Sequence, residues 1–241
     1  MESLKNKVAF ITGGTKGIGY GIAEALMKER MNVAITGRDL FTAKQTAESL
    51  NDKLSGSSKA IGLQADVRDL ASQEEAVKEI IKEFGQIDLV VANAGLGHFA
   101  SVEDITPEQW QETIDTNLTG AFYSLKAGIE ALKKSKGYYI TISSLAGTNF
   151  FPNGSAYNAS KFGLTGFTQA VMLDLRKYGI KVSTIMPGSV STYFNGNEPD
   201  KSDSWKIQIE DIGELVVDLM KMNPRTLPSK IEVRPSMPPS K

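Results

Sequence analysis

Short runs of apolar residues alternate with longer segments of helical period along almost the whole chain. The apolar runs predict strands over residues 8–12, 32–37, 60–65, 88–92, 138–143, 181–186 and 231–234. Leu89, Val90 and Val91 follow one another without a polar residue between them, which is typical of a parallel strand buried on both faces. The pattern therefore predicts an α/β fold, a doubly wound parallel sheet of about seven strands with helices on both faces.

Between the strands, apolar residues recur at intervals of three and four, the spacing of a helix that covers a sheet with one face. The segments 76–84 and 212–220 have this spacing. A polar stretch before the second of them predicts a short mobile loop at about 193–208. The length of 241 residues fits one large α/β domain over residues 1–241.

Residues 106–109 carry the sequence signals of a helix N-terminus. Thr106 can cap the helix, Pro107 suits its first position, and Gln109 stands three residues after the cap. The helical region that begins there is expected to run to about Lys134, with a break near Asp115.

The composition narrows the class of partner. Lys and Arg number 27 against 28 Asp and Glu, so neither nucleic acid nor an anionic membrane is expected to bind. The chain has no cysteine, which leaves no thiolate metal site and fits a reducing compartment. No apolar run reaches the length of a membrane span and the start lacks the apolar core of a signal peptide, so the expected location is cytoplasmic.

The chain contains one histidine, His98, which gives too few histidine side chains for a histidine-based catalytic triad or a cluster of histidine metal ligands. No metal site is therefore expected. His98 follows residues 93–95, where it could line a pocket, but a solvated loop position is favoured and no catalytic role is assigned to it.

Tyr157 and Lys161 stand four residues apart in a helix-compatible stretch, so both side chains leave the same helical face. Lowering the pKa of a tyrosine from ~10 to about 7 requires roughly 4 kcal/mol of stabilisation of the phenolate. A unit positive charge ~4 Å away, at an effective dielectric of ~20, supplies about that much. The pair is thus a candidate general acid/base for interconverting a carbonyl and an alcohol.

A glycine-rich turn follows the first predicted strand. Glycines at positions 13, 14, 17 and 19 lead into a helix that begins near Gly17. The spacing departs from the literal Gly-x-Gly-x-x-Gly fingerprint. It still gives a tight turn whose helix N-terminal amides can face a pyrophosphate.

Together with further motifs, these residues resemble the short-chain dehydrogenase/reductase family over essentially the whole chain. The sequence motifs of the family occur here in the same order as in the family: Thr12-Gly13-(x3)-Gly17-Ile18-Gly19, Asp66-Val67, Asn93-Ala94-Gly95, Asn117, Ile142-Ser143-Ser144, Tyr157-(x3)-Lys161 and Pro187-Gly188-Ser189-Val190-Ser191-Thr192. The resemblance implies a Rossmann-type fold, an oxidoreductase that transfers a hydride between NADP(H) and a carbonyl or alcohol substrate, and a homodimer or homotetramer. The alternative is a catalytically silent NADP(H)-binding sensor or scaffold, which loss of Tyr157 or Lys161 would have marked.

The resemblance also implies the catalytic roles. Tyr157 would be the general acid/base, and Lys161 would lower the pKa of its phenol and hold the nicotinamide ribose. Ser144 would hydrogen-bond the carbonyl oxygen, with Ser143 as the competing choice that the family's spacing disfavours. Asn117 would position a water that connects Lys161 to solvent.

The implied cofactor is NADP (NADPH), with NAD less favoured. NAD-preferring members carry an acid where Gly37 stands here, whereas Lys16 and Arg38 match basic positions that converge on a 2′-phosphate. Asp39 could instead serve a ribose diol, but it is expected to cap the helix that begins at Leu40. The implied cofactor-binding residues are Gly13, Thr15, Lys16, Gly17, Ile18, Gly19, Arg38, Asp66, Val67, Asn93, Ala94, Gly95, Tyr157, Lys161, Pro187, Gly188, Val190 and Thr192.

The substrate is less well defined. Phe150, Phe151 and Tyr193 flank the expected site and suggest an apolar or aromatic carbonyl compound. A 3-oxoacyl thioester, a pterin, a sugar and a xenobiotic ketone all remain open.

Overall fold

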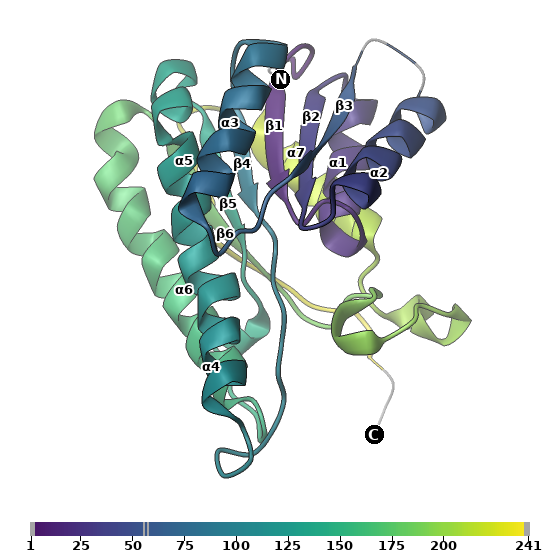
Figure 1. Cartoon of the computed structure of the whole chain (residues 1–241), viewed down its shortest axis with the longest axis vertical. Coiled ribbons are helices and arrows are strands. Elements are labelled where there is room, and N and C mark those ends of the chain that lie inside the picture. The colour runs from purple at the N-terminus through teal and green to yellow at the C-terminus, as the bar shows by residue number, and fades with distance from the viewer. Residues whose placement is uncertain (1–2, 55, 57, 239–241) are drawn as a thin grey trace.

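Seven parallel strands form one sheet that lies between two layers of helices (Figure 1). This computed structural model describes residues 3–54, 56 and 58–238. The strands are β1 (Val8–Thr12), β2 (Asn32–Gly37), β3 (Ala60–Gln64), β4 (Leu89–Ala92), β5 (Tyr138–Ile142), β6 (Lys181–Pro187) and β7 (Lys230–Val233). Each predicted strand is present, with its ends within one residue of the prediction, and the predicted fold class is confirmed.

The helices are α1 (Gly17–Lys28), α2 (Leu40–Lys53), α3 (Leu70–Phe84), α4 (Pro107–Ile114), α5 (Gly120–Ser135), α6 (Ser155–Leu175) and α7 (Ile209–Lys221). The apolar faces of α1, α2 and α7 pack on one side of the sheet, and those of α3, α5 and α6 on the other. Because both faces are covered, the central strands β1 and β4 are buried at every position.

Local signals fix the helix ends that border the site. Thr106 and Gln109 form the predicted capping box, since the Thr106 hydroxyl accepts from Gln109 N at 3.2 Å and the Gln109 amide accepts from Thr106 N at 3.1 Å. The expected break near Asp115 is a π-helical turn, Asp115–Thr119 (η1), between α4 and α5. Asp39 caps α2 as predicted, because its carboxylate accepts from Thr42 N at 2.8 Å.

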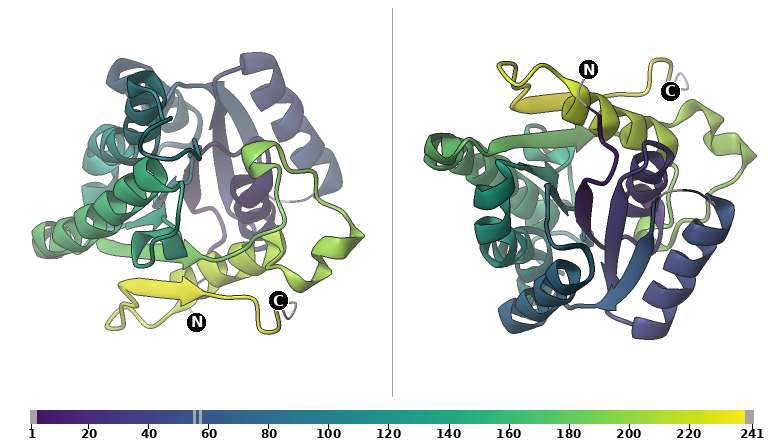
Figure 2. Two further views of the ribbon diagram at one scale, coloured as in Figure 1. Left: turned by 90° about the horizontal axis from the view of Figure 1, so that it is seen from below. Right: turned by 90° about the horizontal axis from the view of Figure 1, so that it is seen from above.

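The strand order β3-β2-β1-β4-β5-β6-β7 reverses direction between β1 and β4. In sheets of this kind a crevice opens at the carboxyl ends of the strands where the order reverses. The left view of Figure 2 looks onto this edge, where the segment 193–208 (light green) projects from the body. That segment was expected to be a loop, and it contains two short 3-10 turns, Phe194–Gly196 (η4) and Lys201–Trp205 (η5). No helix within the described ranges is both long and apolar enough to cross a membrane.

Candidate active site

A cleft of about 850 Å³ lies at the carboxyl ends of the strands, between the glycine turn, the segment after β4, the start of α6 and the segment after β6. All the predicted catalytic and cofactor-binding residues line this cleft except Gly19 and Asn117. The motifs that are scattered along the sequence are therefore brought together at one edge of the sheet.

The glycine turn is packed tightly against the segment after β4. Gly13 has a φ of +63°, and a Cβ added to it would lie 2.9 Å from Ala94 Cα. Asn93 joins the two segments, because its side-chain amide donates to Thr12 O at 2.9 Å and to Gly13 O at 3.0 Å. Gly19 serves this packing rather than lining the cleft, since a Cβ there would lie 2.5 Å from Gly13 O.

The first turn of α1 has no side-chain cap, because Lys16 at its N-cap position makes no capping hydrogen bond. Helix N-terminal amides that lack a capping side chain need acceptors from water or a ligand. Since Lys16, Gly17 and Ile18 line the cleft, an anionic group bound there would meet both these amides and the positive end of the helix dipole.

Two exposed cations, Lys16 and Arg38, line the same end of the cleft. Within the described residues neither forms an ion pair. Gly37 allows the end of β2 to approach the turn, because a Cβ there would lie 2.9 Å from Thr15 Cγ2. Asp39 does not line the cleft; its carboxylate bonds Thr42, and these hydrogen bonds hold its pKa below the usual range.

A polar network borders the next part of the cleft. Arg68 donates to the Asp66 carboxylate from Nη2 at 2.7 Å and from Nε at 3.0 Å, and these hydrogen bonds lower the pKa of Asp66. Arg68 also pairs with Glu112 at 3.4 Å, and Glu112 Oε2 lies 2.9 Å from His98 Nε2. His98 lies in a loop as expected, with 31% of its side chain exposed, and α4 also brings a carboxylate to the ring. His98 does not line the cleft.

Ser144, Tyr157 and Lys161 converge where β5 ends and α6 begins. The Ser144 hydroxyl accepts from Ala146 N at 3.1 Å and lies beside the Tyr157 phenol, on which it acts to lower the pKa. Ser143 also borders the cleft, but its hydroxyl is engaged by α6, where it donates to Lys161 O at 3.2 Å and lies 3.0 Å from Thr165 Oγ1. Of the two serines, Ser144 is therefore the one beside the phenol.

Lys161 is almost completely buried, with 4% of its surface exposed. Its ammonium donates to Ile142 O at 2.9 Å and lies 5.7 Å from the centre of the Tyr157 ring. An ammonium has three donors, and among the described residues this one has a single hydrogen-bond acceptor. Because Lys161 lines the cleft, its other donors can serve a ligand that carries hydroxyl groups.

Burial dominates the titration of this pair in the protein alone. It lowers the pKa of Lys161 to about 8, and it raises the pKa of Tyr157, against the lowering effect of the neighbouring Ser144 side chain. The expected lowering of the Tyr157 pKa by Lys161 is absent, because desolvation of the phenol outweighs the other contributions and the ammonium is directed to Ile142 O.

Asn117 lies in η1 and is buried beside the site. Its side-chain nitrogen donates to Leu96 O at 2.8 Å and to Ser160 Oγ at 3.0 Å, and its oxygen accepts from Leu96 N at 2.9 Å. The side chain thus ties the segment after β4 to α6, one residue from Lys161. These contacts are with distant segments, and not with the nearby helix backbone.

The aromatic residues beside the site differ from those that the sequence suggested. Phe151 and Tyr193 line the cleft, but Phe150 is 84% exposed and does not. Phe99 and Phe194, which the sequence reasoning missed, do line it, and their rings contact that of Tyr157. Their positions just after the 93–95 motif and the 187–192 motif were the available signal.

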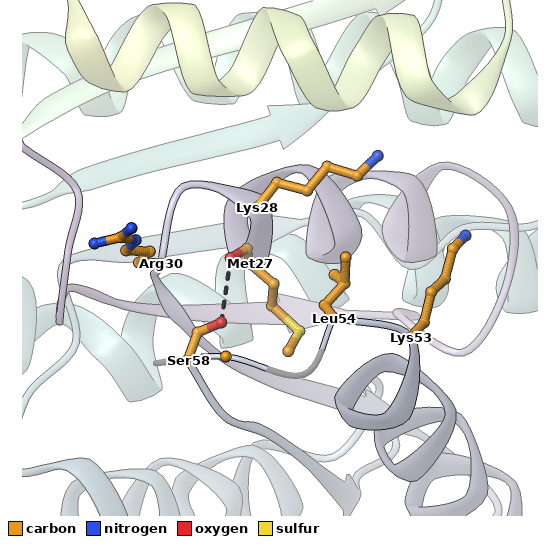
Figure 3. Close-up of a pocket in the computed structure, with 7 residues that line it drawn as sticks. Met27, Lys28, Arg30, Lys53, Leu54 and Ser58 are labelled. Atoms are coloured by element: carbon orange, nitrogen blue, oxygen red, sulfur yellow. Dashed lines mark hydrogen bonds between the residues drawn. The ribbon is translucent and has the colours of Figure 1, made fainter.

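A second hollow, of about 520 Å³, lies at the far end of α1 (Figure 3). Lys28 and Lys53 border it, and both pair with the buried Glu24, at 2.9 and 2.8 Å. Ser58 donates to Met27 O across it. None of the predicted site residues lies there.

Comparisons with known proteins show the family to which the chain is related. The family model for short chain dehydrogenases matches residues 7–203. The chain is 37% identical, over 79% of its length and 75% of the relative's, to trans-4-hydroxycyclohexanecarboxylate dehydrogenase of Sinomonas cyclohexanicum. It is 35% identical to the NADP-dependent (R)-specific alcohol dehydrogenase of Lentilactobacillus kefiri, over 88% of this chain and 86% of that one.

Among solved structures, an alcohol dehydrogenase from the archaeon Thermococcus sibiricus complexed with 5-hydroxy-NADP superposes with a TM-score of 0.89. The two sequences are 29% identical, and the match covers 98% of this chain and 99% of that one. The chain belongs to the short-chain dehydrogenase/reductase family of oxidoreductases.

Proposed function

We propose that the protein is an NADPH-dependent carbonyl reductase in which Tyr157 is the general acid/base. The observation that carries this proposal is the convergence of Ser144, Tyr157 and Lys161 at the cleft, with the Lys161 ammonium 5.7 Å from the centre of the Tyr157 ring. A catalytically silent sensor or scaffold would not need these three groups together.

The cleft fits NADP by three observations. The uncapped N-terminus of α1 suits the pyrophosphate, Lys16 and Arg38 suit a 2′-phosphate, and the buried Lys161 ammonium has donors to offer ribose hydroxyls. Two of the similar proteins are described with NADP or a derivative of it. The remaining residues proposed to hold the cofactor are Gly13, Thr15, Gly17, Ile18, Asp66, Val67, Asn93, Ala94, Gly95, Pro187, Gly188, Val190 and Thr192.

NADPH, when bound, supplies the hydride for the carbonyl carbon. The Ser144 hydroxyl donates a hydrogen bond to the carbonyl oxygen as negative charge grows on it. Tyr157 then transfers its phenolic proton to that oxygen. The raised pKa of Tyr157 keeps the phenol protonated at neutral pH, which is the form that this direction of the reaction requires.

Lys161 acts on the phenolate that remains. At pH 7 its amine, with a pKa of about 8, is mostly protonated, so a positive charge lies near the ring when the proton leaves. Asn117 acts as a positioning residue, because it holds Leu96 and Ser160 in place around the lysine.

The test is turnover of a carbonyl panel, followed by NADPH oxidation, with wild type, Tyr157→Phe and Tyr178→Phe. Tyr178 is a matched control, since it is a partly exposed tyrosine that does not line the cleft. Tyr157→Phe should lower kcat by at least ~10²-fold while calorimetry finds NADPH binding nearly unchanged. Wild-type activity in Tyr157→Phe, or no turnover of any carbonyl by wild type, would contradict the proposal.

A further inference from the structure

Three phenylalanine rings form a connected group beside the ring of Tyr157. Phe99 and Phe194 contact the Tyr157 ring directly, with centroids at 5.3 and 5.8 Å. Phe99 also contacts Phe194 at 6.3 Å and Phe151 at 6.0 Å, so it links the whole group. The three phenylalanines come from separate segments, after β4, before α6 and in η4. We call Phe99, Phe151 and Phe194 the phenylalanine cage.

Two glycines make the cage possible. A Cβ on Gly97 would lie 2.7 Å from Phe99 Cζ and 3.1 Å from Phe194 Cζ, and one on Gly154 would lie 2.6 Å from Phe151 Cε2. The rings therefore pack directly against the backbone of these glycines, where a Cβ atom would be too close to them.

The cage rings are not buried in the core. Phe99 is 37% exposed and Phe151 43% exposed, and all three rings line the cleft. An apolar aromatic surface thus faces the space next to the proposed proton donor. Concave sites that pair such a surface with a few polar groups are typical of binding sites for small apolar molecules.

Besides Lys16 and Arg38, which are proposed to hold the cofactor, two other cations that line the cleft already have ion-pair partners. Among the described residues that line the cleft, Arg68 pairs with Asp66 and Lys206 pairs with Asp203. Lys161 donates to Ile142 O beside the Tyr157 ring. A carboxylate or phosphate on the substrate that contacted the phenyl rings would lose water there, and the rings offer no hydrogen bond to offset that loss.

We infer that the phenylalanine cage binds a flat, neutral aromatic group attached to the reacting carbonyl, so that neutral aryl ketones and aryl keto esters are the substrate class. This inference rests on the proposed reductase activity. A sugar, a pterin or a phosphate-bearing thioester brings hydroxyl, amide or charged groups that phenyl rings cannot hydrogen-bond, so these are disfavoured. An aryl group can pack against the rings edge to face or offset, with its carbonyl near Ser144 and Tyr157.

The experiment uses three matched carbonyls: ethyl phenylglyoxylate, which is neutral and aromatic; phenylglyoxylate, the carboxylate of the corresponding free acid; and ethyl pyruvate, which is neutral without a ring. Wild type should have its highest kcat/KM with ethyl phenylglyoxylate. Phe99→Leu and Phe194→Leu keep an apolar side chain but remove a ring, and each should lower that kcat/KM about 3- to 10-fold. The same variants should change kcat/KM for ethyl pyruvate by less than about 2-fold, because that ester has no ring for the cage to hold.

Phe150→Leu is the control, because Phe150 is 84% exposed, does not line the cleft and makes none of the ring contacts among the described residues. It should leave all three substrates unchanged. Thermal melting and NADPH affinity establish that each variant is folded, and the more exposed Phe151→Leu replaces any cage variant that is not.

A binding measurement separates this inference from the proposed function. Saturation-transfer NMR with acetophenone should detect binding to wild type and to Phe150→Leu, with a signal that weakens in Phe99→Leu and Phe194→Leu. If no carbonyl is turned over, the reductase proposal fails, and the NMR result alone supports or overturns the cage. If turnover occurs but phenylglyoxylate or ethyl pyruvate is preferred, or the cage variants bind and react as wild type does, the cage inference is overturned while the reductase stands.

Discussion

Cofactor preference provides the sharpest test of the cleft's electrostatics. Lys16 and Arg38 line one end of the cleft without ion-pair partners in the described part of the chain. Replacing both by glutamine keeps their length and polarity and removes two positive charges. The variant Lys16→Gln/Arg38→Gln should lose most of the preference for NADPH and keep its use of NADH, because NADH has no 2′-phosphate for these side chains to hold.

The size of the effect follows from the contacts. A hydrogen bond to a charged group contributes about 1.5–3 kcal/mol, so two such contacts correspond to ~10²- to 10⁴-fold in relative specificity. Both side chains are exposed and therefore partly screened by solvent and salt, which favours the lower end of that range. The wild-type preference should accordingly shrink when the ionic strength is raised.

The measurement is the ratio of kcat/KM for NADPH to kcat/KM for NADH in wild type and variants. Lys44→Gln is the control, since Lys44 is an exposed lysine on α2 that does not line the cleft. Asp39→Ala should leave the ratio unchanged and lower the free energy of unfolding, because it removes the cap of α2. A wild-type ratio near one, or a fall in NADH use with Asp39→Ala, would contradict the assigned roles of Lys16 and Arg38. It would indicate instead that Asp39 binds the ribose hydroxyls.

Two further predictions concern the proposed catalytic groups. Ser144→Ala should lower kcat by ~10²-fold or more, since it removes a donor to the developing oxyanion, and Ser143→Ala should be mild; the opposite ranking in steady-state assays would reassign the role. Lys161→Met should abolish most turnover and yet stabilise the protein at pH 7 by about 2 kcal/mol. Burial lowers the lysine pKa from 10.5 to about 8, which destabilises the folded state by about 3 kcal/mol, and the substitution removes this cost. The loss of the hydrogen bond to Ile142 O takes back about 1 kcal/mol of the gain. The folded-state pKa is the lower one, so the gain is complete below pH 8 and fades between pH 8 and 10.5, which denaturant unfolding at several pH values would measure.

Much of the architecture could be predicted from the sequence because its cause is local. A strand covered on both faces must be apolar at every position, as Val8–Thr12 and Leu89–Ala92 are, and such runs end where polar or glycine residues begin. Because parallel strands end at one edge, the motifs after β1, β4, β5 and β6 could be expected to meet there.

The parts that could not be predicted depend on tertiary burial. The pKa of Tyr157 depends on how deeply the phenol is desolvated, which spacing to Lys161 does not reveal. Phe99 and Phe194 lie in segments without periodicity, so nothing in the sequence states that their rings meet over Tyr157. The homo-oligomeric state and the cytoplasmic location stay predictions.

The two pKa shifts at the site have a common cause and a common consequence. Burial opposes both the ammonium of Lys161 and the phenolate of Tyr157, so in the protein alone loss of the phenolic proton is disfavoured. A ligand that brings hydroxyl acceptors to the ammonium raises the lysine pKa toward its ordinary value and fixes the positive charge beside the ring. An aromatic group in the phenylalanine cage then excludes water from the same space, which strengthens the effect of that charge on the phenolate. Proton transfer from Tyr157 is therefore expected to require that the cofactor and the substrate are bound in the cleft at the same time.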